Sequence, residues 1–89
     1  MSAQEKGIKE TGEIKRYKIN KNKAKVKKWA TQHVDKIIDD YCSSGYKYKK
    51  TELYKGLFKV HFQTKCSQYI EVHYYAVSGK FKKWFIKDL

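Results

Sequence analysis

The spacing of apolar residues changes once along this chain, from a helical repeat to a two-residue repeat. Between residues 20 and 42, apolar side chains recur at helical spacing and share one face of a helix. This apolar stripe consists of Val26, Ala30, Val34, Ile37 and Tyr41. Asn20 or Asn22 can cap the helix start, and Gly45 can end the helix in a left-handed conformation. The pattern predicts one amphipathic helix with a single core-facing side.

From Tyr46 onward, apolar and polar residues alternate, which is typical of half-buried strands. The alternation predicts four strands, over residues 46–54, 57–65, 68–77 and 80–89. A slip of one residue would move every side chain of a strand to the opposite face, so the register is constrained. A three-residue loop, Lys65-Cys66-Ser67, keeps the apolar faces of the second and third strands together. The same loop places His61 opposite Glu71.

The turn before the last strand leaves two registers open. A two-residue turn at Ser78-Gly79 places Phe81 and Phe85 on the core face. A three-residue turn places Trp84 and Ile86 there instead.

These elements predict an α+β fold in which one amphipathic helix packs on an antiparallel sheet of three to four sequential strands. Residues 14–19 alternate weakly and are predicted as a short N-terminal edge strand. Residues 1–13 are polar, carry two glycines and are predicted as a flexible tail. The remaining residues, 14–89, are expected to form a single domain.

The charge distribution is unusual for the predicted helix. The chain has a formal net charge of +12, with 21 basic and nine acidic residues, and all but one of the basic residues are lysine. Lysines crowd the predicted start of the helix and aspartates its end, which opposes the helix dipole. A phosphate bound at the helix start would relieve this arrangement, because unpaired backbone N–H groups and ammonium groups meet there. Fraying of residues 20–24 and screening by salt are the alternative explanation.

Lysine clusters interleaved with aromatic rings predict a nucleic-acid-binding surface, with phosphates neutralised by lysine and bases stacked on rings. The candidate residues are Lys21, Lys23, Lys25, Lys27, Lys28, Trp29, Lys47, Lys49, Lys50, Lys59, His73, Tyr75, Lys82 and Lys83. The near-absence of arginine predicts little base readout, since lysine lacks the planar fork that reads guanine. The sequence therefore predicts a small basic accessory protein that binds DNA or RNA with little sequence specificity. Size and composition are typical of phage, viral or plasmid proteins, or of AT-rich microbes.

The outer face of the predicted sheet offers a second prediction. Alternation places Lys59, His61, Tyr69, His73 and Tyr75 on this face, which we expect to be wet. Its rings would stack on bases, or bury against a second copy of the chain in a homodimer, or bury against the N-terminal tail folded across the sheet. The alternative function is that of a protein-interaction module or inhibitor, whose basic surface docks an acidic partner protein. The sequence has no segment that combines a basic face with a large exposed apolar face, so membrane binding is not predicted.

Catalytic and metal-binding patterns are weak. His61 and Glu71 with nearby Cys66 contain the residue types of a nucleophilic site, but cross-strand pairing explains His61 and Glu71 without catalysis. Cys42 and Cys66 have no spacing typical of a zinc site. We therefore predict no enzymatic activity, no cofactor, no metal, and two reduced cysteines in a cytoplasmic protein that has neither an N-terminal signal nor a membrane span.

Overall fold

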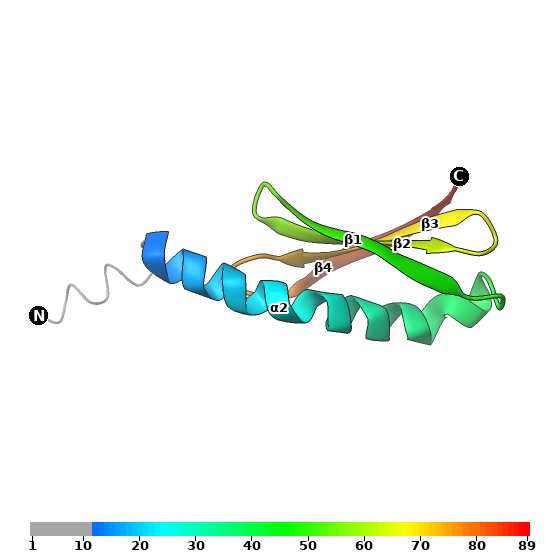
Figure 1. Ribbon diagram of the computed structural model, residues 1–89, viewed down its shortest axis with the longest axis horizontal. Helices are drawn as coiled ribbons and strands as arrows, with labels where there is room; N and C mark the ends of the chain where they lie inside the picture. The colour runs from blue at the N-terminus through cyan, green and yellow to red at the C-terminus, as the bar shows by residue number, and fades with distance from the viewer. Residues whose placement is uncertain (1–11) are drawn as a thin grey trace, which may run out of the picture.

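The computed structural model describes residues 12–89 and contains one long helix and four strands. The helix α2 spans Gly12–Ile37 and continues into a short 3-10 helix, η1, at Ile38–Asp40. The strands are β1 (Tyr46–Tyr54), β2 (Leu57–Thr64), β3 (Gln68–Tyr75) and β4 (Phe81–Asp88). All neighbouring strands pair antiparallel in the order β1-β2-β3-β4 (Figure 1). The predicted α+β class, with one helix on sequential antiparallel strands, is confirmed.

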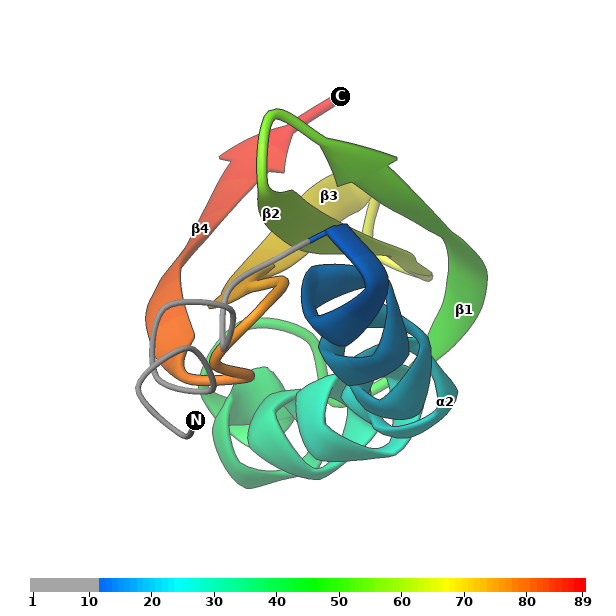
Figure 2. The ribbon, with the colours of Figure 1, turned by 90° about the vertical axis from the view of Figure 1, so that its left-hand side faces the viewer.

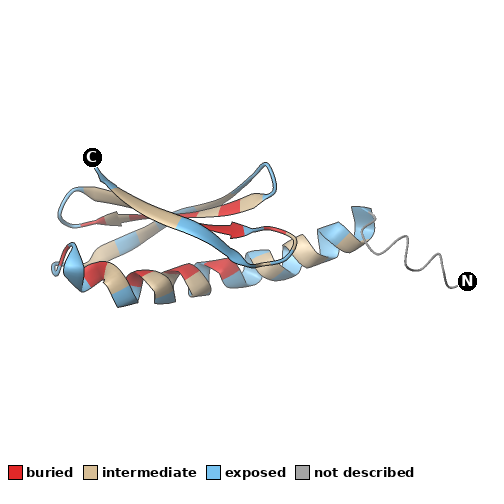
Figure 3. Cartoon of the chain, turned by 180° about the vertical axis from the view of Figure 1, so that it is seen from behind, coloured by how far each residue is buried: buried red, intermediate tan, exposed pale blue. Residues whose placement is uncertain are grey.

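The sheet curls around the helix, so that α2 lies on the concave side of the arc of strands (Figure 2). The buried apolar residues of the helix and of the sheet face each other across one interface (Figure 3). The helix contributes Val26, Ala30 and Val34, each fully buried. The sheet contributes Phe58, Val60, Phe62, Ile70, Val72 and Tyr74. Burial of this apolar surface is the main stabilising contribution to the fold.

The predicted register of the two central strands is confirmed. Val60 pairs with Val72, and His61 lies opposite Glu71. Residues 65–67 form the loop between β2 and β3, where Ser67 has φ 63°. The apolar sets of both strands therefore face the helix, as the parity of the loop requires.

The structure decides between the two registers of the last strand. Trp84 pairs with Val72 and Ile86 with Ile70, so both side chains pack against the core. A shift in the ladder between His73 and Tyr74 then brings Phe81 opposite Tyr74. The bulge thus turns Phe81 to the helix side as well, a combination that neither simple turn predicts.

The helix begins earlier than the sequence pattern indicates. Residues 14–19 are helical, so the predicted N-terminal edge strand is wrong. Gly12 and Glu13, predicted as part of the tail, form the first turn of α2, and residues 1–11 lie outside the described residues. No glycine or proline occurs between Gly12 and Gly45 to interrupt a helix, and lysine and arginine are good helix formers.

The helix also ends differently. The chain tightens at Ile38, whose carbonyl accepts hydrogen bonds from the N–H groups of Tyr41 and Cys42. Ile38 is buried in the core, whereas Tyr41, which was predicted on the apolar stripe, is 43% exposed. A 3-10 turn rotates successive side chains by about 120° rather than 100°, and this moves the stripe. Gly45 has φ 106°, in the left-handed region that was predicted for it.

A disulfide joins the end of the helix to the sheet. Cys42 and Cys66 are bonded, with an S–S distance of 2.11 Å and 5.8 Å between their Cα atoms. The prediction of two reduced cysteines is therefore wrong. Cys42 follows the helix and Cys66 lies in the β2–β3 loop, so only the packing of the helix along the sheet brings them together. The spacing of 24 residues along the sequence carried no signal of this contact.

Candidate nucleic-acid interface

The helix α2 carries the longest run of basic residues without an acidic residue among the described residues. Eight of the 21 residues from Ile14 to Val34 are basic and none is acidic. The predicted binding residues on this helix, Lys21, Lys23, Lys25, Lys27 and Lys28, are all exposed.

These lysines lie in the middle of α2 rather than at its start. Interior backbone N–H groups of a helix already donate to carbonyls four residues earlier. They are not free to bind an anion, so the predicted phosphate site at the helix N-terminus is wrong. Glu13 occupies the first turn, where a negative charge is favoured by the helix dipole.

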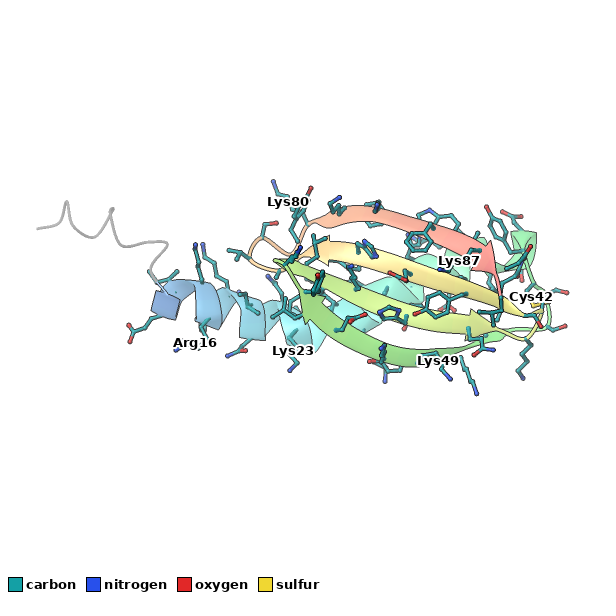
Figure 4. All side chains as sticks on the ribbon, turned by 90° about the horizontal axis from the view of Figure 1, so that it is seen from above. Arg16, Lys23, Cys42, Lys49, Lys80 and Lys87 are labelled. Carbon is teal, nitrogen blue, oxygen red and sulfur yellow. A yellow bond between two sulfur atoms is a disulfide. The ribbon has the colours of Figure 1, made fainter. Side chains whose placement is uncertain are left out.

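The N-terminal turns of α2 extend past the end of the sheet (Figure 1). Arg16 lies on this overhang, and Lys23 lies near the point where the sheet begins to cover the helix (Figure 4). Tyr17 is 67% exposed, and the first fully buried helix residue is Val26. The overhang therefore presents basic side chains to solvent over a larger part of its circumference than a helix packed along a sheet.

Asn22 joins the overhang to the loop between β3 and β4. Its Nδ2 donates to the carbonyl oxygens of Ala76 and Val77, at 2.9 and 3.0 Å. Gly79 lies against the same side chain, and a Cβ built on it would be 2.8 Å from Asn22 Oδ1. Gly79 also has φ 77°, which favours glycine. Asn22, predicted as a possible helix cap, is instead a tertiary contact.

A cleft with a mixed polar and apolar lining opens beside this contact. It has a volume of about 390 Å³ and lies between the helix and the β3–β4 loop. Lys18, Lys21 and Asn22 line it from the helix, and Val77 and Ser78 line it from the loop.

The outer face of the sheet is less wet than the sequence predicts. Cross-strand pairing confirms that His61, Tyr69 and His73 share this face with Lys59 and Tyr75. However, His61 and His73 are each only 4% exposed. Tyr75, at 44% exposed, is the predicted stacking residue that remains accessible.

Hydrogen bonds account for the buried His61. Its Nε2 lies 2.6 Å from a carboxylate oxygen of Glu52, and its Nδ1 pairs with the hydroxyl of Tyr69. A carboxylate accepts, so in neutral His61 the proton is on Nε2 and Tyr69 donates to Nδ1. Burial, then the charges of Glu71 and Glu52, raise the pKa of Tyr69. These contacts tie β1, β2 and β3 together, which is a structural role.

His73 is held in the same way. Its Nε2 lies 2.8 Å from a carboxylate oxygen of Glu71, and the ring of Phe85 packs edge-on at 5.7 Å. Its Nδ1 is buried without a hydrogen-bond partner. A ring enclosed on this scale is not a stacking platform, so the prediction that His73 contacts bases is wrong.

The lysine clusters of the strands lie far apart. Lys47, Lys49 and Lys50 belong to β1, whereas Lys82 and Lys83 belong to β4. These are the two edges of the sheet, as the positions of Lys49 and Lys87 show in Figure 4. The structure therefore does not gather all the predicted residues into one patch.

Three other predicted binding residues contact aromatic rings of the fold. Trp29 packs against the core, with its ring 5.7 Å from that of Tyr74, so it is not free to stack on a base. Lys27 Nζ lies 4.2 Å from the centre of the Tyr48 ring, and Lys59 Nζ lies 4.9 Å from that of Tyr54. Such cation–π contacts orient both ammonium groups along the sheet.

The nominal catalytic set does not assemble. Cys66 is bonded to Cys42 and has no thiol to act as a nucleophile. Among residues 12–89, no three histidine, cysteine or acidic side chains gather closely enough to hold a metal ion.

Sequence reasoning missed Arg16, Lys18, Asn22 and Ser78. The first two were assigned to a strand, and the contact of Asn22 with the loop depends on residues more than 50 positions away. The one signal in the sequence that could have predicted a helix reaching Arg16 and Lys18 was the run of basic residues without a helix breaker.

No protein-family model, curated protein or solved structure matches this chain. Within the described residues, neither helix is both long and apolar enough to cross a membrane.

Proposed function

We propose that this protein binds nucleic acid through phosphate contacts along α2, with little sequence specificity and without enzymatic activity. One observation carries the proposal: from Ile14 to Val34 the helix has eight basic residues and no acidic residue, and its first turns extend beyond the sheet. A helix packed on a small domain does not need this charge for stability. Like charges at i and i+4, such as Lys21 and Lys25, repel each other by roughly 0.2–0.5 kcal/mol per pair.

A bound polyanion neutralises these lysines and so removes their mutual repulsion. Each lysine that neutralises a phosphate releases a counterion, which makes binding favourable and strongly dependent on salt. The helix is about 10–12 Å wide with its side chains, which matches the major groove of a DNA duplex at roughly 12 Å. Lysine contacts phosphate as a point charge, so this surface fixes a backbone without reading bases.

The test is a titration of labelled single strands and duplexes at two salt concentrations. The helix variant Lys21→Gln/Lys25→Gln/Lys28→Gln is compared with the sheet-edge variant Lys47→Gln/Lys49→Gln/Lys50→Gln. Both remove three positive charges, so overall charge is matched. We expect the helix variant to bind more weakly and to lower the salt slope on duplex DNA by about three, since each phosphate contact contributes about 0.9.

Two results would contradict the proposal. The first is equal weakening in both variants, which would mean that net charge alone attracts the polyanion. The second is no binding by the parent protein even at low salt, which would leave an acidic protein partner as the function predicted from this charge.

The cellular compartment of the protein is also a matter of proposal, and the disulfide bears on it. Cytoplasmic placement requires the Cys42–Cys66 bond to be reduced there, because cytosolic thiol systems keep most cysteines reduced. Disulfides persist in oxidising compartments, so the bond favours a location outside the cytosol. Thiol labelling of the protein in intact cells, before any lysis, decides between the two.

A further inference from the structure

The cleft between α2 and the β3–β4 loop has the features of a ligand-binding site. The structural roles of its residues do not account for these features. We infer that it seats the sugar-phosphate backbone of one nucleotide of the bound strand. This inference rests on the proposed function and names the place where the strand is anchored.

Charge is the first reason. The cleft forms where two acid-free segments of the chain meet, residues 14–34 of the helix and residues 72–87 around the loop. Lys18 and Lys21 line one wall, and the loop that forms the other wall continues into Lys80 at the same end of the molecule (Figure 4). Lys18 and Lys21 of the helix therefore lie at the same end of the molecule as Lys80, which is remote in sequence and follows the loop wall.

Size and lining are the second reason. A volume of about 390 Å³ lies within the range of small-ligand sites and exceeds what a simple inorganic anion needs. The side chains of Val77 and Ser78 offer an apolar surface for a sugar and a hydroxyl for a phosphate oxygen. No aromatic ring lines the cleft, so a base has no stacking partner inside it. The seat would take the backbone and leave the base outside, in keeping with binding that ignores sequence.

Rigidity is the third reason. The two hydrogen bonds from Asn22 hold the loop against the helix, and Ala76 N–H donates to the carbonyl of Gly56 from the other side at 2.9 Å. The loop itself is closed by Gly79 N–H, which donates to Tyr75 at 2.8 Å. Walls that are already ordered lose little conformational freedom when a ligand binds, and this improves affinity.

A pair of lysine variants tests the seat in the full-length protein. Lys21 lines the cleft and Lys28 does not, although both are exposed on the same helix. Each is replaced by Gln, and binding of a fluorescent ten-nucleotide strand is measured by anisotropy. Loss of a charge-assisted hydrogen bond at a seat predicts about tenfold weaker binding for Lys21→Gln, against about twofold for Lys28→Gln.

A second pair adds charge from the loop side. Ser78→Glu places a carboxylate in the cleft, and Ser44→Glu places one at an exposed position near the disulfide. Ser78 Oγ accepts the N–H of Lys80 at 3.2 Å, so thermal melts of both variants check that the fold is intact. We expect Ser78→Glu to weaken binding at least about tenfold and Ser44→Glu to weaken it by less than about threefold.

The outcomes separate the two proposals. If the parent protein binds no nucleic acid at low salt, the proposed function itself fails. If it binds, but the two members of each pair weaken binding equally, the cleft is not a seat and phosphates are held diffusely along the helix. Unequal loss in both pairs, with unchanged melting temperatures, establishes the seat.

Discussion

Removal of the Asn22 side chain should loosen the attachment of the helix overhang to the sheet. Asn22→Ala deletes two hydrogen bonds to the carbonyls of Ala76 and Val77, each with a net contribution of about 0.5–1.5 kcal/mol. Alanine is the better helix former and returns about 0.5 kcal/mol. The expected net loss is therefore about 0.5–2.5 kcal/mol, or a melting temperature lower by roughly 2 °C or more for a domain of this size.

The matched control lies two residues earlier. Asn20 is exposed on the same helix and has no hydrogen bond to the loop. Asn20→Ala makes the same chemical change and should keep or slightly raise the melting temperature, because only helix propensity changes. Differential scanning calorimetry of both variants gives the comparison. Equal stability of the two variants would refute the tertiary role of Asn22.

Gly79 provides an internal check on the same contact. In the parent protein, Gly79→Ala meets both an unfavourable φ of 77° and the carboxamide oxygen 2.8 Å away. In the Asn22→Ala background the second obstacle is gone, and only the backbone cost of about 1–2 kcal/mol remains. The two substitutions should therefore be less destabilising together than the sum of their separate effects. Strict additivity would mean that the two residues do not touch in solution.

Three further predictions concern the disulfide and the titrating groups. Reduction of Cys42–Cys66 should lower stability by about 3.5 kcal/mol, the chain-entropy value for a loop of this length, measured by urea unfolding with and without a reductant. Burial, together with a neighbouring carboxylate for Tyr46, raises the pKa of Tyr46 and of Tyr74 to about 12. Because the pKa of each tyrosine is higher in the folded state than in the unfolded state, its contribution to stability is complete below pH 10 and is lost as pH rises toward 12. An absorbance titration with thermal melts at each pH would measure this loss. Burial and a neighbouring lysine lower the pKa of His33, so stability should fall as pH drops below about 6.5, and His33→Phe should remove this fall.

The sheet was predictable because alternation and loop parity are local constraints. Once Phe58 and Val60 face the core, a three-residue loop leaves one register that keeps the third strand's apolar residues on the same side. The last strand was ambiguous for a physical reason. The bulge after His73 lets Trp84 and Phe81 face the helix together, and a bulge leaves no mark in the alternation itself.

The helix start was mispredicted because its first turns have few core contacts. Hydrophobic periodicity reports which residues are buried, and residues 12–18 of an overhanging helix bury little. The apparent conflict between the lysines and the helix dipole has the same cause, the mispredicted helix start. Lysines that look misplaced at a helix start are ordinary mid-helix residues once Gly12 is the first residue of α2.

The candidate site depends on contacts that a single sequence does not encode locally. Lys21 and Ser78 line one cleft, and Cys42 and Cys66 form one bond, only because a 26-residue helix runs the length of the sheet. The charge that motivates the functional proposal was visible in the composition, but its place was not. Most lysines of the strands lie on opposite sheet edges, and the junction at the β3–β4 loop brings the acid-free stretch of the helix beside that of the sheet. Lys21 lines the cleft at that junction whereas Lys28, also exposed on the helix, does not, which is why the proposed binding should depend on Lys21 more than on Lys28.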